Sequence, residues 1–140
     1  MCSSDLNAYS AESITIDNIR EDITIEVKSV KQISAPTVTC VWNDVDESGK
    51  LSVKDTVTLT FSESVTVATE PAVGGTGITA TDNVDAGDTN VDSIVYTVTA
   101  VGTDDMTITI NAGDVKTADG MQVVPTTFTI DDATGSVTKG

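Results

Sequence analysis

Apolar side chains recur at every second position along most of the chain. Val57, Leu59 and Phe61, for example, alternate with threonines, and no segment keeps apolar residues at helical spacing for three turns. Successive side chains of a β-strand point to opposite faces of its sheet, so each such run has one apolar and one Thr-rich face. Sheets with one buried and one solvated face are typically antiparallel. The sequence therefore predicts an all-β protein with Ile108 and Phe128 beside Phe61 in its core.

Turn-forming residues separate the alternating runs. The segments Asp46–Gly49, Asp85–Asp88 and Asp119-Gly120 combine Asp, Ser and Gly, which favour turns between strands. Residues 35–131 are close to the roughly 100 residues of an immunoglobulin-like antiparallel β-sandwich. The seven strands that we predict in this span are 36–42, 56–62, 64–68, 77–82, 93–101, 105–111 and 124–130.

The residues outside this span fall into three parts. Residues 1–6 are interpreted as a non-native leader, and residues 132–140 as a tail or linker. Residues 7–34 contain two more alternating runs, which predict an extra N-terminal β-hairpin. Because two strands alone are marginally stable in water, this hairpin must pack on something. It closes onto the sandwich, ends a preceding β domain, or acts as a donor strand for a neighbouring subunit.

Charge narrows the possible partners. The chain has 7 Lys and Arg residues against 22 Asp and Glu residues, a formal net charge of −15, and no His. Such a chain repels phosphate backbones, so we expect no nucleic-acid partner. No apolar run approaches the ~20 residues that a spanning helix needs, and we expect no membrane span. Asp outnumbers Glu by 16 to 6, which suits acidic loops of a β protein.

The composition lacks the parts of most catalytic sites. Without His, neither a Ser-His-Asp or Cys-His arrangement nor the usual zinc sites can form. Aromatic residues make up 4% of the chain, too few for the lined cleft of a glycoside hydrolase, so we predict that the protein is not an enzyme. Trp42 is expected to fill the core, with a sugar-stacking platform as the alternative. Cys40 is expected to be a small buried hydrophobe, and a disulfide to Cys2 stays open.

One acidic loop has the spacing of a calcium site. From Asp44 to Asp55, oxygen-bearing side chains stand at loop positions 1, 3, 5, 9 and 12, with Gly49 at position 6 for a sharp turn. The alternative is a plain hairpin rich in Asp, Ser and Gly. A second acidic loop has no recognised register and is the weaker candidate; its acids are Asp82, Asp85, Asp88 and Asp92. The predicted calcium ligands are Asp44, Asp46, Ser48, the Lys50 carbonyl, Ser52 and Asp55.

Several short runs resemble a known family. The run Asp55–Val65 is similar to an early-strand signature of bacterial immunoglobulin-like repeat domains of S-layer and other surface proteins. Thr117–Met121 followed by Thr126–Ile130 resembles the closing hairpin of that family, although Met121 stands where the family often has Asn. Upstream, Ser13–Val30 is similar to the end of another bacterial repeat domain.

The resemblance implies a function and a compartment. It implies a structural or adhesive repeat module of a larger extracellular or cell-surface protein, without catalysis. The expected partners are neighbouring domains of the same chain, and possible ones are like subunits or surface glycans. Two alternatives are kept: a carbohydrate-binding module of a secreted hydrolase, and a filament subunit in which residues 13–31 form the donor strand.

Overall fold

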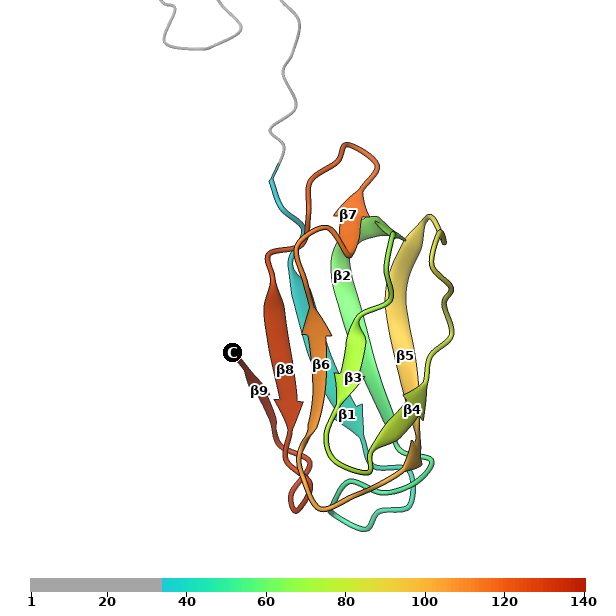
Figure 1. Cartoon of the computed structure of the whole chain (residues 1–140), viewed down its shortest axis with the longest axis vertical. Coiled ribbons are helices and arrows are strands. Elements are labelled where there is room, and N and C mark those ends of the chain that lie inside the picture. The colour runs from blue at the N-terminus through green and yellow to red at the C-terminus, as the bar shows by residue number, and fades with distance from the viewer. Residues whose placement is uncertain (1–33) are drawn as a thin grey trace, which may run out of the picture. The chain divides into compact units, whose positions relative to one another are not determined.

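Residues 34–140, the part that the computed structural model describes, contain nine β-strands and no helix. The predictions for residues 1–33, among them the N-terminal hairpin, lie outside the described residues. Figure 1 shows the strands as two layers packed face to face. The strands are β1 (Val38–Asn43), β2 (Thr56–Val67), β3 (Ala72–Gly74), β4 (Thr79–Thr81), β5 (Val91–Ala100), β6 (Met106–Ile110), β7 (Val115–Thr117), β8 (Thr126–Ile130) and β9 (Val137–Lys139).

The first sheet has the strand order β1-β2-β5-β4, and β7 joins it beside β2. All of its neighbours pair antiparallel. Val65 of β2 pairs with Val91 on one side and with Thr117 on the other, so β7 lies on the same side of β2 as β1. The short β7 therefore continues the edge that β1 begins.

The second sheet has the order β3-β6-β8-β9 and is also antiparallel. Ile108 of β6 pairs with Phe128 of β8, and both face inward, whereas Thr107 and Thr129 form an outward-facing pair. On the outer face the hydroxyls of Thr109 and Thr127 are 3.1 Å apart and share a hydrogen bond. The alternation of aliphatic and Thr positions thus produces one dry and one wet face, as predicted.

The core lies between the two sheets and confirms the predicted all-β antiparallel sandwich. Phe61, Ile108 and Phe128 are all buried. Tyr96 is the largest fully buried side chain, and its hydroxyl donates to the Pro71 carbonyl at 3.3 Å, which satisfies the polar end of the ring. Leu59 and further aliphatic residues of the strands and loops complete the core: Val38, Leu51, Val57, Val65, Val67, Ile78, Val84, Ile94, Val98, Met106, Ile110, Val115, Val123 and Ile130.

The structure corrects several strand boundaries. The runs predicted as 56–62 and 64–68 form one strand of 12 residues, and its pairing with β5 shifts register between Thr60 and Val65. The polar triplet 62–64 interrupts the side-chain alternation without ending the strand. Strand β4, with three residues, lies within the run predicted as 77–82. Strands β3, β7 and β9 have three residues each and were not predicted, because their short runs show no clear alternation.

The tail or linker predicted for residues 132–140 is instead part of the sandwich. Val137–Lys139 form β9, which pairs with β8 from Phe128 to Ile130. The turn between the two strands is closed by the Asp131 carbonyl, which accepts the Gly135 amide at 2.8 Å. The sandwich therefore extends beyond residue 131, and the sequence signal was weak because Asp131–Ser136 reads as an isolated polar loop.

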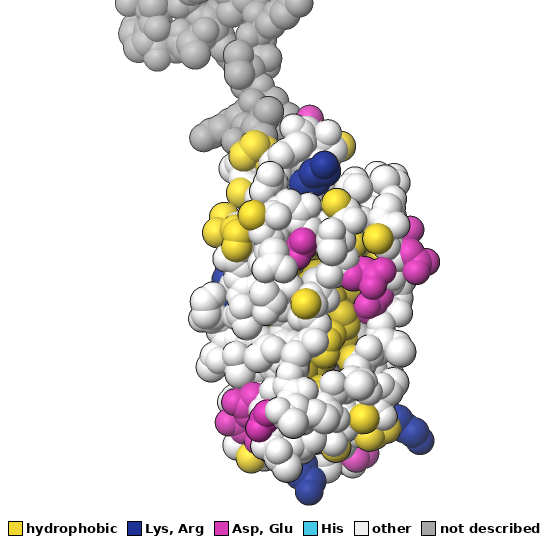
Figure 2. All heavy atoms as spheres, in the orientation of Figure 1, with side chains coloured by type: hydrophobic (Ala, Val, Ile, Leu, Met, Phe, Trp, Pro, Cys, Tyr) yellow, Lys and Arg dark blue, Asp and Glu magenta, His cyan; other side chains and the backbone are white. Residues whose placement is uncertain are grey.

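Three connections meet at one end of the sandwich, which we call the acidic pole: Asp44–Asp55, 101–105 and 131–136. The Leu51 amide donates to the Asp132 carbonyl at 3.0 Å, and the Asp132 amide donates to a carboxylate oxygen of Asp105 at 3.1 Å. On the face shown in Figure 2, carboxylates occur in separate groups with mostly uncharged surface between them. Among residues 34–140 no helix is long and apolar enough to cross a bilayer.

Candidate metal centre

The candidate calcium loop connects β1 to β2 at the acidic pole. Asp44 begins the loop, and its two carboxylate oxygens accept the amides of Ser48 at 3.1 Å and Gly49 at 2.6 Å. This folds the chain back over Asp44. Gly49 has a φ of 74°, the left-handed conformation that its place in the predicted sharp turn requires.

Asp46 accepts hydrogen bonds from two serines. One carboxylate oxygen receives the Ser48 amide at 3.0 Å, and the other receives the Ser52 hydroxyl at 2.9 Å. Hydrogen bonds from Ser48 and Ser52 lower the pKa of Asp46 to about 2, because they favour the charged form. Asp46 is therefore a carboxylate at any physiological pH.

Asp55 closes the loop from inside the protein. Its side chain is fully buried, and one carboxylate oxygen accepts the Val45 amide at 2.9 Å. The other oxygen accepts the Ser52 amide at 2.9 Å and the indole N–H of Trp42 at 3.1 Å. Hydrogen bonds from three donors balance the cost of burying this group.

Trp42 supports Asp55 from the sandwich side. Its ring is partly buried and packs against the core, in keeping with the predicted core role. Gly135 of the turn before β9 lies against the ring, and a Cβ built at Gly135 would be 2.0 Å from a ring carbon. The φ of Gly135 is 68°. Glycine is thus required there both for its conformation and for its lack of a side chain.

Three carboxylates of the loop converge. Carboxylate oxygens of Asp44, Asp46 and Asp55 all lie within 4.8 Å of one another. The Ser48 hydroxyl, another predicted ligand, donates to the Lys50 carbonyl at 2.9 Å. All six predicted ligand residues therefore belong to one local hydrogen-bond network, with Lys50 contributing its carbonyl and Ser52 both its amide and its hydroxyl.

The hydrogen bonds leave room for further ligation. A carboxylate offers about four lone-pair positions, whereas Asp44 and Asp46 each accept two of the hydrogen bonds described above and Asp55 accepts three. A hard cation that takes six to eight oxygens fits carboxylate, hydroxyl and carbonyl donors of this kind.

The weaker candidate loop does not form such a cluster. Asp82 accepts the Val84 amide at 3.2 Å, and Asp88 accepts the Asp85 amide at 3.0 Å, so both stabilise their own turns. Asp92 accepts the Ser64 hydroxyl. In the described part of the chain, no three acids of this loop bring carboxylate oxygens within 4.8 Å of one another.

A second group of neighbouring carboxylates was not predicted from the sequence. Asp105, Asp131 and Asp132 bring carboxylate oxygens within 4.8 Å of one another. Asp105 directly precedes β6 and Asp131 directly follows β8, and Met106 pairs with Ile130 across these strands. Recognising β6 and β8 as an antiparallel pair would have placed these acids side by side.

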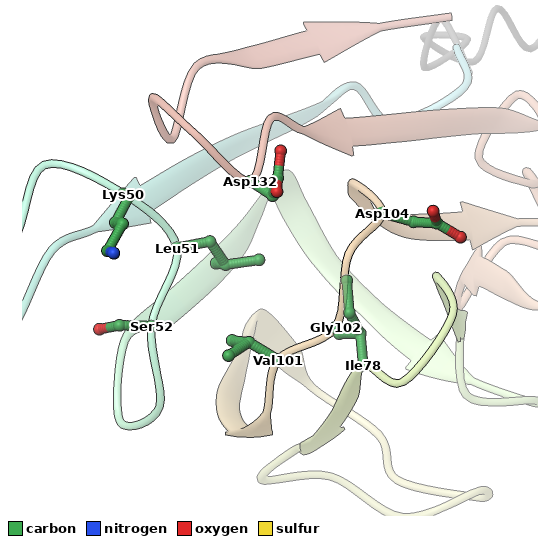
Figure 3. A pocket seen from close by; sticks show the side chains of 8 residues that line it. All are labelled: Lys50, Leu51, Ser52, Ile78, Val101, Gly102, Asp104 and Asp132. Carbon is green, nitrogen blue, oxygen red and sulfur yellow. The ribbon is translucent and has the colours of Figure 1, made fainter.

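A shallow pocket of about 230 Å³ lies between the loops of the acidic pole. Figure 3 shows the Leu51 side chain reaching between Asp132 and Val101, while the side chains of Lys50 and Asp104 point away from Leu51. Leu51 is buried, and Asp104 accepts the Thr76 amide at 3.2 Å. The pocket is thus an indentation with an aliphatic wall beside the candidate metal loop.

No protein-family model, curated protein or solved structure matches the chain. The class that its structure establishes is an all-β protein with two packed antiparallel sheets.

Proposed function

We propose that this domain is a non-catalytic structural or adhesive module of a larger secreted or cell-surface protein, and that calcium bound in the Asp44–Asp55 loop stabilises it. The observation that carries the calcium part is the convergence of Asp44, Asp46 and Asp55 within 4.8 Å. Like charges at this separation repel one another, and a divalent cation converts that repulsion into attraction.

The ligands would come from the loop alone. Asp44, Asp46 and Asp55 supply carboxylates, Ser48 and Ser52 supply hydroxyls, and the Lys50 carbonyl supplies a backbone oxygen. Asp55 is already fixed by its three donors, so little side-chain entropy would be lost when the cation binds.

Bound calcium would stiffen the acidic pole as a whole. The loop joins the end of β1 to the start of β2, and its Leu51 amide is tied to the Asp132 carbonyl in the turn between β8 and β9. A cation held by this loop would therefore couple the two sheets at this end of the sandwich. Such stiffening suits a module that holds its neighbours apart in a surface protein.

The surface-protein part rests on a resemblance to bacterial immunoglobulin-like repeats, together with the sandwich fold. The segments that carry the resemblance are Asp55–Val65, Thr117–Met121 and Thr126–Ile130. The DNA sequence on both sides of this reading frame tests it. A signal peptide upstream and further β repeats would support the proposal, whereas a flanking catalytic domain would favour the carbohydrate-binding alternative.

Differential scanning calorimetry tests the calcium part. We expect calcium at 100 times its Kd to stabilise the domain by about 2.7 kcal/mol relative to EDTA, and Asp46→Ala to abolish the difference. Asp88→Ala, which removes an acid of the other loop, should leave the response intact. Equal melting temperatures with calcium and with EDTA would refute a calcium role and leave the fold unaffected.

A further inference from the structure

The edges of the two sheets are unequally protected against pairing with another chain. Strand β4 has three residues, a register shift between Thr79 and Ala80, and Asp82 just beyond it. Strands β3 and β9 also have three residues each, and β9 carries Lys139. Shortness, bulges and charges are the features by which soluble proteins prevent edge-to-edge association.

Strand β1 has none of these protections. It has six residues, Val-Thr-Cys-Val-Trp-Asn, with no charged residue and no proline, and its pairing with β2 is continuous from Val38 to Asn43. Val41 of this strand is 59% exposed. Within residues 34–140, the outer edge of β1 pairs with no strand, since β9 is paired with β8 alone.

The backbone groups that β1 leaves free can be identified. The Ser62 amide donates to the Thr37 carbonyl at 2.9 Å, and these residues are directly opposite in the register that continues into β1. Hydrogen-bonded and non-bonded pairs alternate in an antiparallel ladder. The N–H and C=O groups of Val38, Cys40 and Trp42 therefore point to the outer edge.

We propose that β1 pairs antiparallel with β1 of a second copy of this chain, joining the first sheets of both copies into one continuous sheet across a twofold axis. This contact is separate from the proposed calcium-stabilised module function and does not depend on it.

Charge favours a second copy that lies antiparallel. Two chains of net charge −15 repel each other over most of their surface, but β1 and the outward-facing Thr56, Thr58 and Thr60 of β2 carry no charge. Asp44 follows β1 directly. An antiparallel pair places the two acidic poles at opposite ends, whereas a parallel pair would bring them side by side.

Side-chain direction limits the axis to a residue position, and the free backbone groups of Val38, Cys40 and Trp42 select which residue. Residues directly opposite each other must lie on the same face of the joined sheet. Centring the axis on Cys40 satisfies this rule: Cys40 faces its counterpart, Val38 lies opposite Trp42 of the second copy, and Thr39 lies opposite Val41. All free groups of the edge then form hydrogen bonds. A six-residue edge buries much less than the roughly 1,200–2,000 Å² of a stable interface, so the dimer is weak and needs high protein concentration.

Sedimentation equilibrium of the full chain tests whether two copies dimerise through strand β1. Cys2→Ser serves as the background, so that no disulfide from Cys2 interferes. Val41→Glu adds a negative charge near the axis, and Val124→Glu is the matched control, because Val124 is 66% exposed and lies outside every strand. We expect Val41→Glu to weaken dimerisation at least tenfold more than Val124→Glu does. Equal effects, or a monomer at every concentration, would overturn the proposal.

Disulfide trapping tests the register. Thr39→Cys and Val41→Cys are made separately in a Cys2→Ser, Cys40→Ala background, mixed and oxidised. Opposite residues in a non-bonded pair have Cα atoms about 4.5 Å apart, within disulfide range, so the mixed disulfide should exceed both homodisulfides. Predominance of either homodisulfide would contradict this register. A monomer whose Val38, Cys40 and Trp42 amides are protected from hydrogen exchange would mean that residues 1–33 cover the edge, which also overturns the proposal.

Discussion

The two acidic loops of this domain have similar compositions and different architectures. The Asp44–Asp55 loop contains four acids, as does the segment from Asp82 to Asp92. In the first, backbone amides and the Ser52 hydroxyl hold three carboxylates that converge. In the second, Asp82 and Asp88 each accept an amide of their own turn. The number of acids therefore does not decide whether carboxylates converge; the turn geometry that directs them does.

Substituting Asp55 should give the largest difference between the two loops in the free energy of unfolding. Asp55→Ala removes a fully buried acceptor and leaves the Trp42 indole and the amides of Val45 and Ser52 without partners. We expect a loss of about 3 kcal/mol in the free energy of unfolding, measured with urea in EDTA. Asp88→Ala in the other loop should cost less than about 0.5 kcal/mol. Similar costs for the two variants would show that the loops do not differ as described.

Two glycine-to-alanine substitutions compare how tightly the chain packs beside each acidic loop. Gly135 and Gly87 both have positive φ, but a Cβ at Gly135 would overlap the Trp42 ring, whereas one at Gly87 meets nothing within 4 Å. Gly135→Ala should therefore lose about 2 kcal/mol through overpacking and conformational strain. Gly87→Ala should lose about 1 kcal/mol through strain alone. The urea midpoint and the Trp42 emission maximum measure this, and an unchanged emission maximum in Gly135→Ala would contradict the described packing.

Acid titration gives the smallest expected effect, because Asp46 is exposed. Its pKa of about 2 in the folded state lies below the unfolded value of about 3.9. Its contribution to stability is therefore complete above about pH 4 and is lost as the pH falls toward about 2. The stability difference between wild type and Asp46→Asn, measured with urea in EDTA, should shrink over this window. A difference that stays constant over this window would contradict the assignment.

The sandwich could be predicted from sequence because alternation of aliphatic residues with Thr fixes which face of each strand is buried. Phe61, Ile108 and Phe128 were placed in the core on that basis alone, and all three are buried. The three-residue strands β3, β7 and β9 could not be found this way. Strand β9, for example, exists because the turn after Ile130 returns the chain to β8, which is a tertiary effect rather than a local pattern.

The candidate site was predictable to the extent that its ligands lie in one segment. The spacing from Asp44 to Asp55 placed six residues in one register, and all six join the observed network. The burial of Asp55 and its bond to Trp42 were not foreseen, because they depend on where the loop meets the sandwich. The trio Asp105, Asp131 and Asp132 was missed for a related reason, since its members meet only through strand pairing.

Terbium luminescence tests the central claim most directly, because Tb³⁺ occupies calcium sites and emits when a nearby tryptophan transfers energy to it. Trp42 is the only tryptophan of the chain, and its indole N–H lies 3.1 Å from a carboxylate oxygen of Asp55. Excitation of Trp42 should produce terbium emission that calcium displaces. The emission should vanish in Asp44→Asn/Asp46→Asn and persist in Asp85→Asn/Asp88→Asn. Absence of sensitised emission from the wild type, or equal emission from both double variants, would contradict a cation site in the Asp44–Asp55 loop.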